Sequence, residues 1–119
     1  MKRILVVEDN ETNIYLISFI LRKNDYEVTE ARTGEEGVEL AIKEKPDLII
    51  MDIQLPGIDG LEATRKIRES EADGEVPIIA LTSYAMTGDR ERALKAGCTG
   101  YIEKPINPDT FISEIKKYL

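Results

Sequence analysis

LIIMDIQLPGIDG, residues 48–60, is the segment that decides the predicted fold, because a buried strand ends in it and a loop begins. Four apolar residues run directly into Asp52, and Pro56, Gly57 and Gly60 follow, all of them residue types that favour turns. An unbroken apolar run of this length is typical of a strand in a parallel sheet that is covered on both faces. A carboxylate at the end of a buried strand is unusual, and the residues that follow the other predicted strands help to explain it.

The rest of the chain alternates between short apolar runs and segments with helical periodicity. The segment 26–32 alternates apolar and polar residues, as an edge strand does. Alternating strands and helices predict a parallel sheet with right-handed crossovers and helices on both faces. The predicted strands are 4–7, 26–32, 48–51, 77–82 and 100–105, and the predicted helices are 11–23, 34–45, 60–70, 88–97 and 108–119.

Capping residues mark the predicted helix ends. Thr33, with Glu36 three residues later, matches a capping box, and Asp59 stands in a related position before the third helix. Gly97 predicts a left-handed helix stop, and Asn107 with the proline after it predicts the start of the last helix.

Size and composition predict one globular domain in the cytoplasm. The 119 residues carry a formal net charge of −7, which argues against direct binding to nucleic acids or to anionic membranes. No apolar run approaches the ~18 residues that span a bilayer, so membrane insertion is not expected. Cys98 is the only cysteine and histidine is absent, which indicates a reducing compartment and excludes a histidine base or metal ligand.

Polar residues follow several predicted strands, and ligands bind at the carboxyl ends of strands in parallel sheets. Each residue also has an ordinary structural explanation. Asp9 or Asn10 could cap the first helix. Glu8 could be a solvated charge, and Asp52 could start a turn. Their convergence on one edge of the sheet nevertheless favours a functional site. The residues at the strand ends are Glu8, Asp9, Asp52, Thr82, Ser83 and Lys104.

The charges at this edge predict a divalent cation. Glu8, Asp9 and Asp52 carry a formal charge of −3, Lys104 supplies +1, and a divalent cation would make the site neutral. With oxygen ligands and no histidine or cysteine, Mg²⁺ is the natural choice. Mg²⁺ usually shares its ligand shell with phosphate oxygens, so a phosphoryl group is the expected guest.

The chain resembles the receiver domain of the two-component response regulators, in particular the stand-alone CheY-like and DivK-like receivers. The resemblance covers essentially the whole chain, so it implies a single receiver domain over residues 1–119. It implies an α/β, flavodoxin-like fold, doubly wound, with five parallel strands in the order 2-1-3-4-5 and five helices. The segments that carry it are ILVVEDN (4–10), PDLIIMDIQLPGIDGLE (46–62), PIIALTSYA (77–85) and AGCTGYIEKPI (96–106).

The resemblance implies roles for the residues at the strand ends. Asp52 would accept a phosphoryl group from a phosphohistidine on a sensor histidine kinase or a histidine phosphotransfer protein. Asp9 and Asp52 would ligate Mg²⁺ directly. Glu8 would act mainly through water, and Gln54 through its backbone carbonyl. Lys104 would contact the phosphoryl oxygens, so that catalysis works by positioning and charge neutralisation.

The resemblance also implies a switch and an output surface. Thr82 and Tyr101 match residues that move together after phosphorylation. Their movement would remodel the face of the fourth helix, fifth strand and fifth helix, where a downstream protein effector would bind. Gln54 and Tyr84 match positions that tune the lifetime of the phosphoryl group. In the family, the bond before the proline that matches Pro105 is usually cis.

Two alternatives stay open at this point. The chain could be a pseudo-receiver that docks partners without being phosphorylated, although such proteins usually lose an acid or the lysine. It could also be a receiver excised from a hybrid histidine kinase, which would look much the same. No output domain is expected beyond Leu119, so the response is expected to pass through noncovalent partners. The expected protein is a signalling switch that catalyses its own phosphorylation and dephosphorylation, and not an enzyme in the usual sense.

Overall fold

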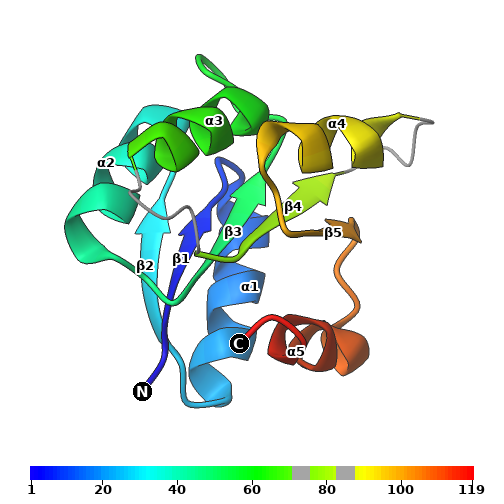
Figure 1. The fold of residues 1–119 in the computed structure, drawn as a ribbon. Coiled ribbons are helices and arrows are strands. Elements are labelled where there is room, and N and C mark those ends of the chain that lie inside the picture. The colour runs from blue at the N-terminus through cyan, green and yellow to red at the C-terminus, as the bar shows by residue number, and fades with distance from the viewer. Residues whose placement is uncertain (71–75, 83–87) are drawn as a thin grey trace.

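The computed structural model describes residues 1–70, 76–82 and 88–119 of the chain. Strands and helices alternate strictly along this part of the chain (Figure 1). Within the described ranges, no helix has the length and the apolar content needed to cross a membrane. The elements are β1 (Arg3–Val7), α1 (Glu11–Lys23), β2 (Glu27–Ala31), α2 (Gly34–Glu44), β3 (Leu48–Asp52), α3 (Gly60–Ser70), β4 (Ile78–Thr82), α4 (Asp89–Ala96), β5 (Gly100–Glu103) and α5 (Pro108–Lys116).

The strands form one parallel sheet in the order β2-β1-β3-β4-β5, which confirms the predicted fold (Figure 1). β3 lies at the centre, and all of its residues are buried. β2 lies at an edge, as its alternating sequence predicts. Helices α2, α3 and α4 cover one face of the sheet, and α1 and α5 cover the other. The fold is therefore doubly wound.

The sheet separates two apolar cores, because successive side chains of a strand point to opposite faces. Ile4 and Val6 of β1 pack into the core beneath α1 and α5, which also holds Phe111. Leu5 and Val7 pack into the core beneath α2, α3 and α4. Since both faces of β3 and β4 are covered, these two strands are apolar at every position before their polar last residues, Asp52 and Thr82.

The predicted helix caps are confirmed with one difference. The Thr33 hydroxyl accepts a hydrogen bond from the Glu36 backbone N–H at 3.1 Å. The Glu36 carboxylate, however, accepts from the N–H of Arg32, one residue earlier than a capping box requires. Helix α4 ends at Ala96, and the next residue, Gly97, has φ 116°, in the left-handed region. Asn107 caps α5 with its side chain. The helix starts and stops are therefore encoded locally.

Two predicted elements are too long by two or more residues at their carboxyl ends. β5 ends at Glu103 and not at Pro105, because proline has no N–H to donate to the sheet. The Lys104–Pro105 bond is cis, as the resemblance noted in the sequence implies. Helix α5 ends at Lys116, and the chain to Leu119 continues with backbone hydrogen bonds between residues three apart.

Candidate functional site

The strand register brings the predicted residues to one edge of the sheet. Glu8 follows the last residue of β1, and the pairing of β1 with β3 places it next to Asp52, the last residue of β3. On the other side of β3, β4 ends with Thr82, one residue beyond the partner of Asp52. Parallel pairing therefore makes one cluster from residues that are far apart in the sequence.

The start of α1 separates the roles of Asp9 and Asn10. Asn10 is the N-cap, and its side-chain oxygen accepts a hydrogen bond from the Asn13 N–H at 3.0 Å. Asp9 is exposed and makes no hydrogen bond or ion pair with the described residues. The capping explanation thus applies to Asn10, and the Asp9 carboxylate is available for another partner.

Three carboxylates meet at this edge with one ammonium. Oxygens of Glu8, Asp9 and Asp52 all lie within 4.8 Å of one another. Glu8 is 0% exposed and Asp52 is 1% exposed, so the interpretation of Glu8 as a solvated charge is wrong. Lys104 Nζ lies 2.8 Å from Glu8 Oε2 and 3.2 Å from Asp52 Oδ2. The ammonium therefore bridges the two buried carboxylates.

Both carboxylate oxygens of Asp52 have partners. Oδ1 accepts a hydrogen bond at 3.0 Å from the N–H of Gln54, whose side chain is exposed, so Asp52 also makes the turn that its sequence allows. Burial raises the pKa of Asp52 to about 6, and the charge of Glu8 adds to the rise, against the opposite effects of the Gln54 N–H and Lys104. Burial lowers the pKa of Lys104, but Glu8 and Asp52 together raise it above its usual value.

Two backbone features of the site were not predicted from the sequence. The Asn10 N–H donates to Glu8 Oε1 at 3.2 Å and orients that buried carboxylate. At the start of α3, a Cβ on Gly60 would lie 2.6 Å from the Cα of Ile53, so only glycine fits against the end of β3. The sequence signal for this contact is a glycine directly after the capping residue Asp59, whose side chain accepts from the third N–H of the helix.

The proposed switch residues lie on the two strands beside the site. Thr82 is 0% exposed, and its carbonyl accepts a hydrogen bond from the Lys104 N–H at 2.7 Å. Tyr101 is half-buried on β5 and lines a surface pocket of about 320 Å³. Ser83 and Tyr84 lie outside the described residues. The end of β4 is thus tied directly to the loop that carries Lys104.

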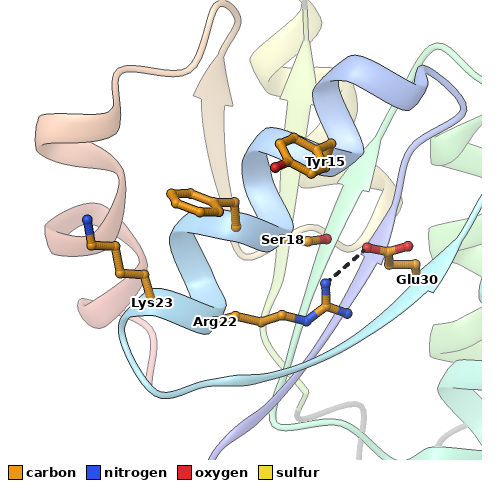
Figure 2. A pocket seen from close by; sticks show the side chains of 6 residues that line it. Tyr15, Ser18, Arg22, Lys23 and Glu30 are labelled. Carbon is orange, nitrogen blue, oxygen red and sulfur yellow. Dashed lines mark ion pairs between the residues drawn. The ribbon is translucent and has the colours of Figure 1, made fainter.

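A groove of about 420 Å³ lies between α1 and β2, and Glu8, Asp9 and Asp52 are not among the residues that line it (Figure 2). Tyr15 is 70% exposed and Phe19 is 53% exposed, and their rings stack with centroids 6.3 Å apart. Lys23 Nζ lies 5.9 Å from the Phe19 ring centroid. Figure 2 shows Arg22 reaching across the groove to Glu30, with an ion-pair distance of 3.6 Å. Helix α1 therefore presents an aromatic surface that also carries positive charge.

The residues at the strand ends fit a hard divalent cation. The converging ligands are carboxylate oxygens, which Mg²⁺ prefers, and their charge exceeds the single positive charge of Lys104. Asp9 is exposed, so the cluster is accessible from solvent.

Comparison with known proteins agrees with this arrangement. The family model described as the response regulator receiver domain matches residues 4–116. The polar-differentiation response regulator DivK of Brucella ovis is 45% identical over 118 residues, which cover 99% of this chain and 96% of that protein. A receiver domain of a sensor histidine kinase from Pseudomonas aeruginosa is 41% identical with a TM-score of 0.91, covering 98% of this chain and 96% of that one. That structure has a magnesium ion coordinated in its active-site cleft.

A third similar structure is a receiver domain of a response regulator from Saccharomyces cerevisiae, solved together with its histidine phosphotransfer protein. It is 32% identical with a TM-score of 0.91, and the match covers 98% of this chain and 88% of that one. The family match, these relatives and the strand order all agree. The chain belongs to the response regulator receiver family and is a receiver domain of two-component signal transduction.

Proposed function

We propose that the chain is a phosphorylation switch in which Asp52 accepts a phosphoryl group from a phosphohistidine in a Mg²⁺-dependent reaction. One observation carries the proposal: Glu8, Asp9 and Asp52 converge within 4.8 Å, and Lys104 Nζ lies 3.2 Å from Asp52 Oδ2. The switch would act in the cytoplasm as one receiver domain over residues 1–119, and it would promote its own phosphorylation and dephosphorylation.

Asp52 supplies the nucleophile. A carboxylate oxygen attacks phosphorus, the new P–O bond forms as the P–N bond breaks, and the electron pair of the broken bond stays with the donor imidazole. At pH 7 and above the carboxylate is mostly ionised, because its pKa is about 6. Lys104 contacts the phosphoryl oxygens and offsets their charge.

The remaining polar residues would hold the metal. Asp9 and Asp52 are its direct ligands, Glu8 contributes mainly through water, and Gln54 contributes its backbone carbonyl. When bound, Mg²⁺ neutralises charge on the transferring phosphoryl group. The Asn10 N–H and Lys104 keep Glu8 turned toward the site.

The test is to incubate the protein with acetyl phosphate, with Mg²⁺ or with EDTA, and to measure intact masses. We expect one phosphoryl adduct that requires Mg²⁺. Borohydride reduction followed by peptide mapping should place it at residue 52, as homoserine. If folded protein forms no adduct with acetyl phosphate or with a phosphorylated histidine phosphotransfer protein, the proposal is wrong and a pseudo-receiver is the better description.

The phosphoryl donor would be a sensor histidine kinase or a histidine phosphotransfer protein, and we place its docking surface on α1. This helix begins two residues after Asp9, so its first turn lies close to the site. Its exposed residues therefore form a surface next to the site. Tyr15, Phe19 and Lys23 follow one another at intervals of four residues and therefore lie on one side of the helix. The surface fits a donor helix with an apolar ridge and an acidic residue that meets Lys23.

The docking proposal predicts different results for protein and small-molecule donors. Replacing Tyr15 and Phe19 together by alanine should slow phosphotransfer from the cognate protein donor by about tenfold or more. Phosphorylation by acetyl phosphate should be unchanged, because the carboxylates are untouched. Ile42→Ala is the control, since Ile42 is an exposed apolar residue on α2. Equal loss with both donors, or no loss with the protein donor, would contradict the docking surface.

Thr82 and Tyr101 would pass the signal to a downstream protein effector on the face of α4, β5 and α5. The tie between Thr82 and the Lys104 loop supports this coupling. Thr82→Ala should still form the adduct, but its affinity for the effector should no longer change on phosphorylation. Thr82→Ser keeps the hydroxyl and should keep the change. The measurement is the affinity for the effector with and without phosphodonor. If phosphorylation still changes the effector affinity of Thr82→Ala, the proposed coupling through Thr82 is wrong.

A further inference from the structure

We propose that the chain forms a two-fold dimer in which the β2 strands of two copies pair antiparallel, so that one sheet runs through both copies. The proposal concerns a surface outside the carboxylate site and goes beyond the proposed function. It starts from the outer edge of β2, with which no other strand pairs within the described ranges (Figure 1).

The backbone of β2 shows which of its groups face the neighbouring strand. At one end, the Glu27 N–H donates to the Lys2 carbonyl, and at the other end the Ala31 carbonyl accepts from the Glu8 N–H. Both ends of β2 are therefore turned toward β1. Because this direction alternates along a strand, Thr29, midway between the two ends, also faces β1.

The two residues between them, Val28 and Glu30, direct their N–H and C=O groups away from the sheet. An edge of this kind is a template for another strand. The Arg22 guanidinium donates to the outward carbonyl of Val28, but the distance is 3.5 Å, at which a hydrogen bond is weak. Arg22 also pairs with the Glu30 carboxylate at 3.6 Å, so it keeps a partner when a strand N–H replaces it at Val28.

Two such edges fit one another when Thr29 lies beside the two-fold axis. Val28 then stands opposite Glu30 of the second copy, and the two residues exchange both N–H···O=C bonds. The axis repeats this pair, so every outward backbone group of Val28 and Glu30 is satisfied in both copies. Thr29 meets Thr29 of the second copy at the closer, non-hydrogen-bonded spacing, which is a favourable cross-strand pair. Glu27 stands opposite Ala31, so no like charges lie directly opposite one another.

The charges around this edge also favour a second copy. The chain has a net charge of −7, so two copies repel each other on most approaches. The two grooves that border β2 are lined by three basic and three acidic side chains, which leave this edge with no net charge. A second copy meets little repulsion here, and a strongly basic or acidic partner finds no net attraction. The charged residues are Arg3, Arg22, Lys23, Glu27, Glu30 and Glu44.

The first experiment places a cysteine beside the predicted axis. Thr29→Cys brings two thiols to the spacing of a non-hydrogen-bonded antiparallel pair, which suits a disulfide. We expect a disulfide-linked dimer after mild oxidation with diamide, measured by intact mass without reductant. Thr110→Cys on α5 is the control, because Thr110 is more exposed than Thr29 and should link far less. Wild type should not link, since Cys98 is 6% exposed.

The second experiment weakens the same contact by charge. Thr29→Lys sets two ammonium groups directly opposite one another, and its dimer dissociation constant, from sedimentation equilibrium, should be about fivefold or more above that of wild type. Thr29→Val keeps the β-branched shape and should dimerise like wild type. Thr110→Lys changes the net charge equally and should also dimerise like wild type.

The outcomes decide the proposal. It is overturned if wild type stays monomeric at every concentration up to its solubility limit, or if Thr29→Cys links no more than Thr110→Cys. A wild-type dimer that Thr29→Lys and Thr110→Lys weaken equally uses another face, which also overturns it. If wild type is monomeric and an effector loses affinity for Thr29→Lys, the edge serves that partner and not a second copy.

Discussion

Replacing Asp52 with asparagine is expected to abolish phosphorylation and to raise the free energy of unfolding at pH 8 by on the order of 2 to 3 kcal/mol. The amide cannot form the acyl phosphate. It also carries no charge, whereas the Asp52 carboxylate is 1% exposed and lies beside Glu8. The pKa of Asp52, about 6 instead of 3.8, reflects how unfavourable the ionised form is there. Lys104 keeps its 2.8 Å ion pair with Glu8 in the variant.

The pH dependence of stability tests the cause of this gain. The folded-state pKa of Asp52 lies above its unfolded value, so the folded protein holds this proton more tightly than the unfolded chain does. The contribution of Asp52 to stability is therefore fully present below about pH 4 and is lost as the pH rises through about 6. The advantage of the asparagine variant should grow from pH 4 to pH 7 and stay level above it.

Urea unfolding of both proteins in EDTA, between pH 5 and pH 8, measures this difference. Asp47→Asn is the matched control, because Asp47 is an exposed aspartate directly before β3. Its asparagine can still accept the hydrogen bond that Asp47 receives from the Arg3 N–H. An advantage of Asp52→Asn that does not change with pH, or one that Asp47→Asn shares, would contradict the explanation by buried charge.

The predicted gain implies that the unphosphorylated site opposes folding at neutral pH. Buried like charges are retained at the cost of stability when a ligand or a reaction requires them. Binding of Mg²⁺ to the folded state alone would recover part of that stability. In the proposed function, the same unfavourable charge serves to attract the metal.

Local sequence patterns were sufficient to predict most of the fold. The continuous apolar run before Asp52 predicted a central strand, and the alternating segment 26–32 predicted an edge strand. Thr33 and Gly97 marked helix ends where the structure has them. Each of these signals acts within a few residues along the chain, and this explains why the sequence alone suffices.

Tertiary contacts at the site could not be predicted in the same way. Nothing in the sequence distinguishes Asn10 from Asp9 as the helix cap, because both side chains suit that position. The complete burial of Glu8 and its bridge to Asp52 through Lys104 depend on how separate strands align. Position along the sheet edge was therefore predictable, whereas the pairing of individual atoms was not.

Gly60→Ala is expected to lower the free energy of unfolding by about 3 kcal/mol and to slow phosphorylation by acetyl phosphate. A Cβ at this position would press on the carbonyl oxygen of Asp52 and lie 2.6 Å from the Cα of Ile53. Both are backbone atoms, so no rotation of a side chain relieves the contact. The backbone has to shift at the residue that carries the nucleophile, and the geometry of Asp52 relative to Lys104 changes with it.

Gly88→Ala separates this contact from the general cost of replacing a glycine. Gly88 has φ 102°, and a Cβ added there would meet no atom of the described residues within 4 Å, so only backbone strain of about 1 kcal/mol is expected. Urea unfolding and the rate of adduct formation are measured for both variants. If Gly60→Ala is destabilised but reacts at the wild-type rate, the contact supports the fold without positioning Asp52. If the rate falls while Gly88→Ala reacts normally, the close approach of α3 to β3 is part of the site, because it holds the strand end where the carboxylate must stand.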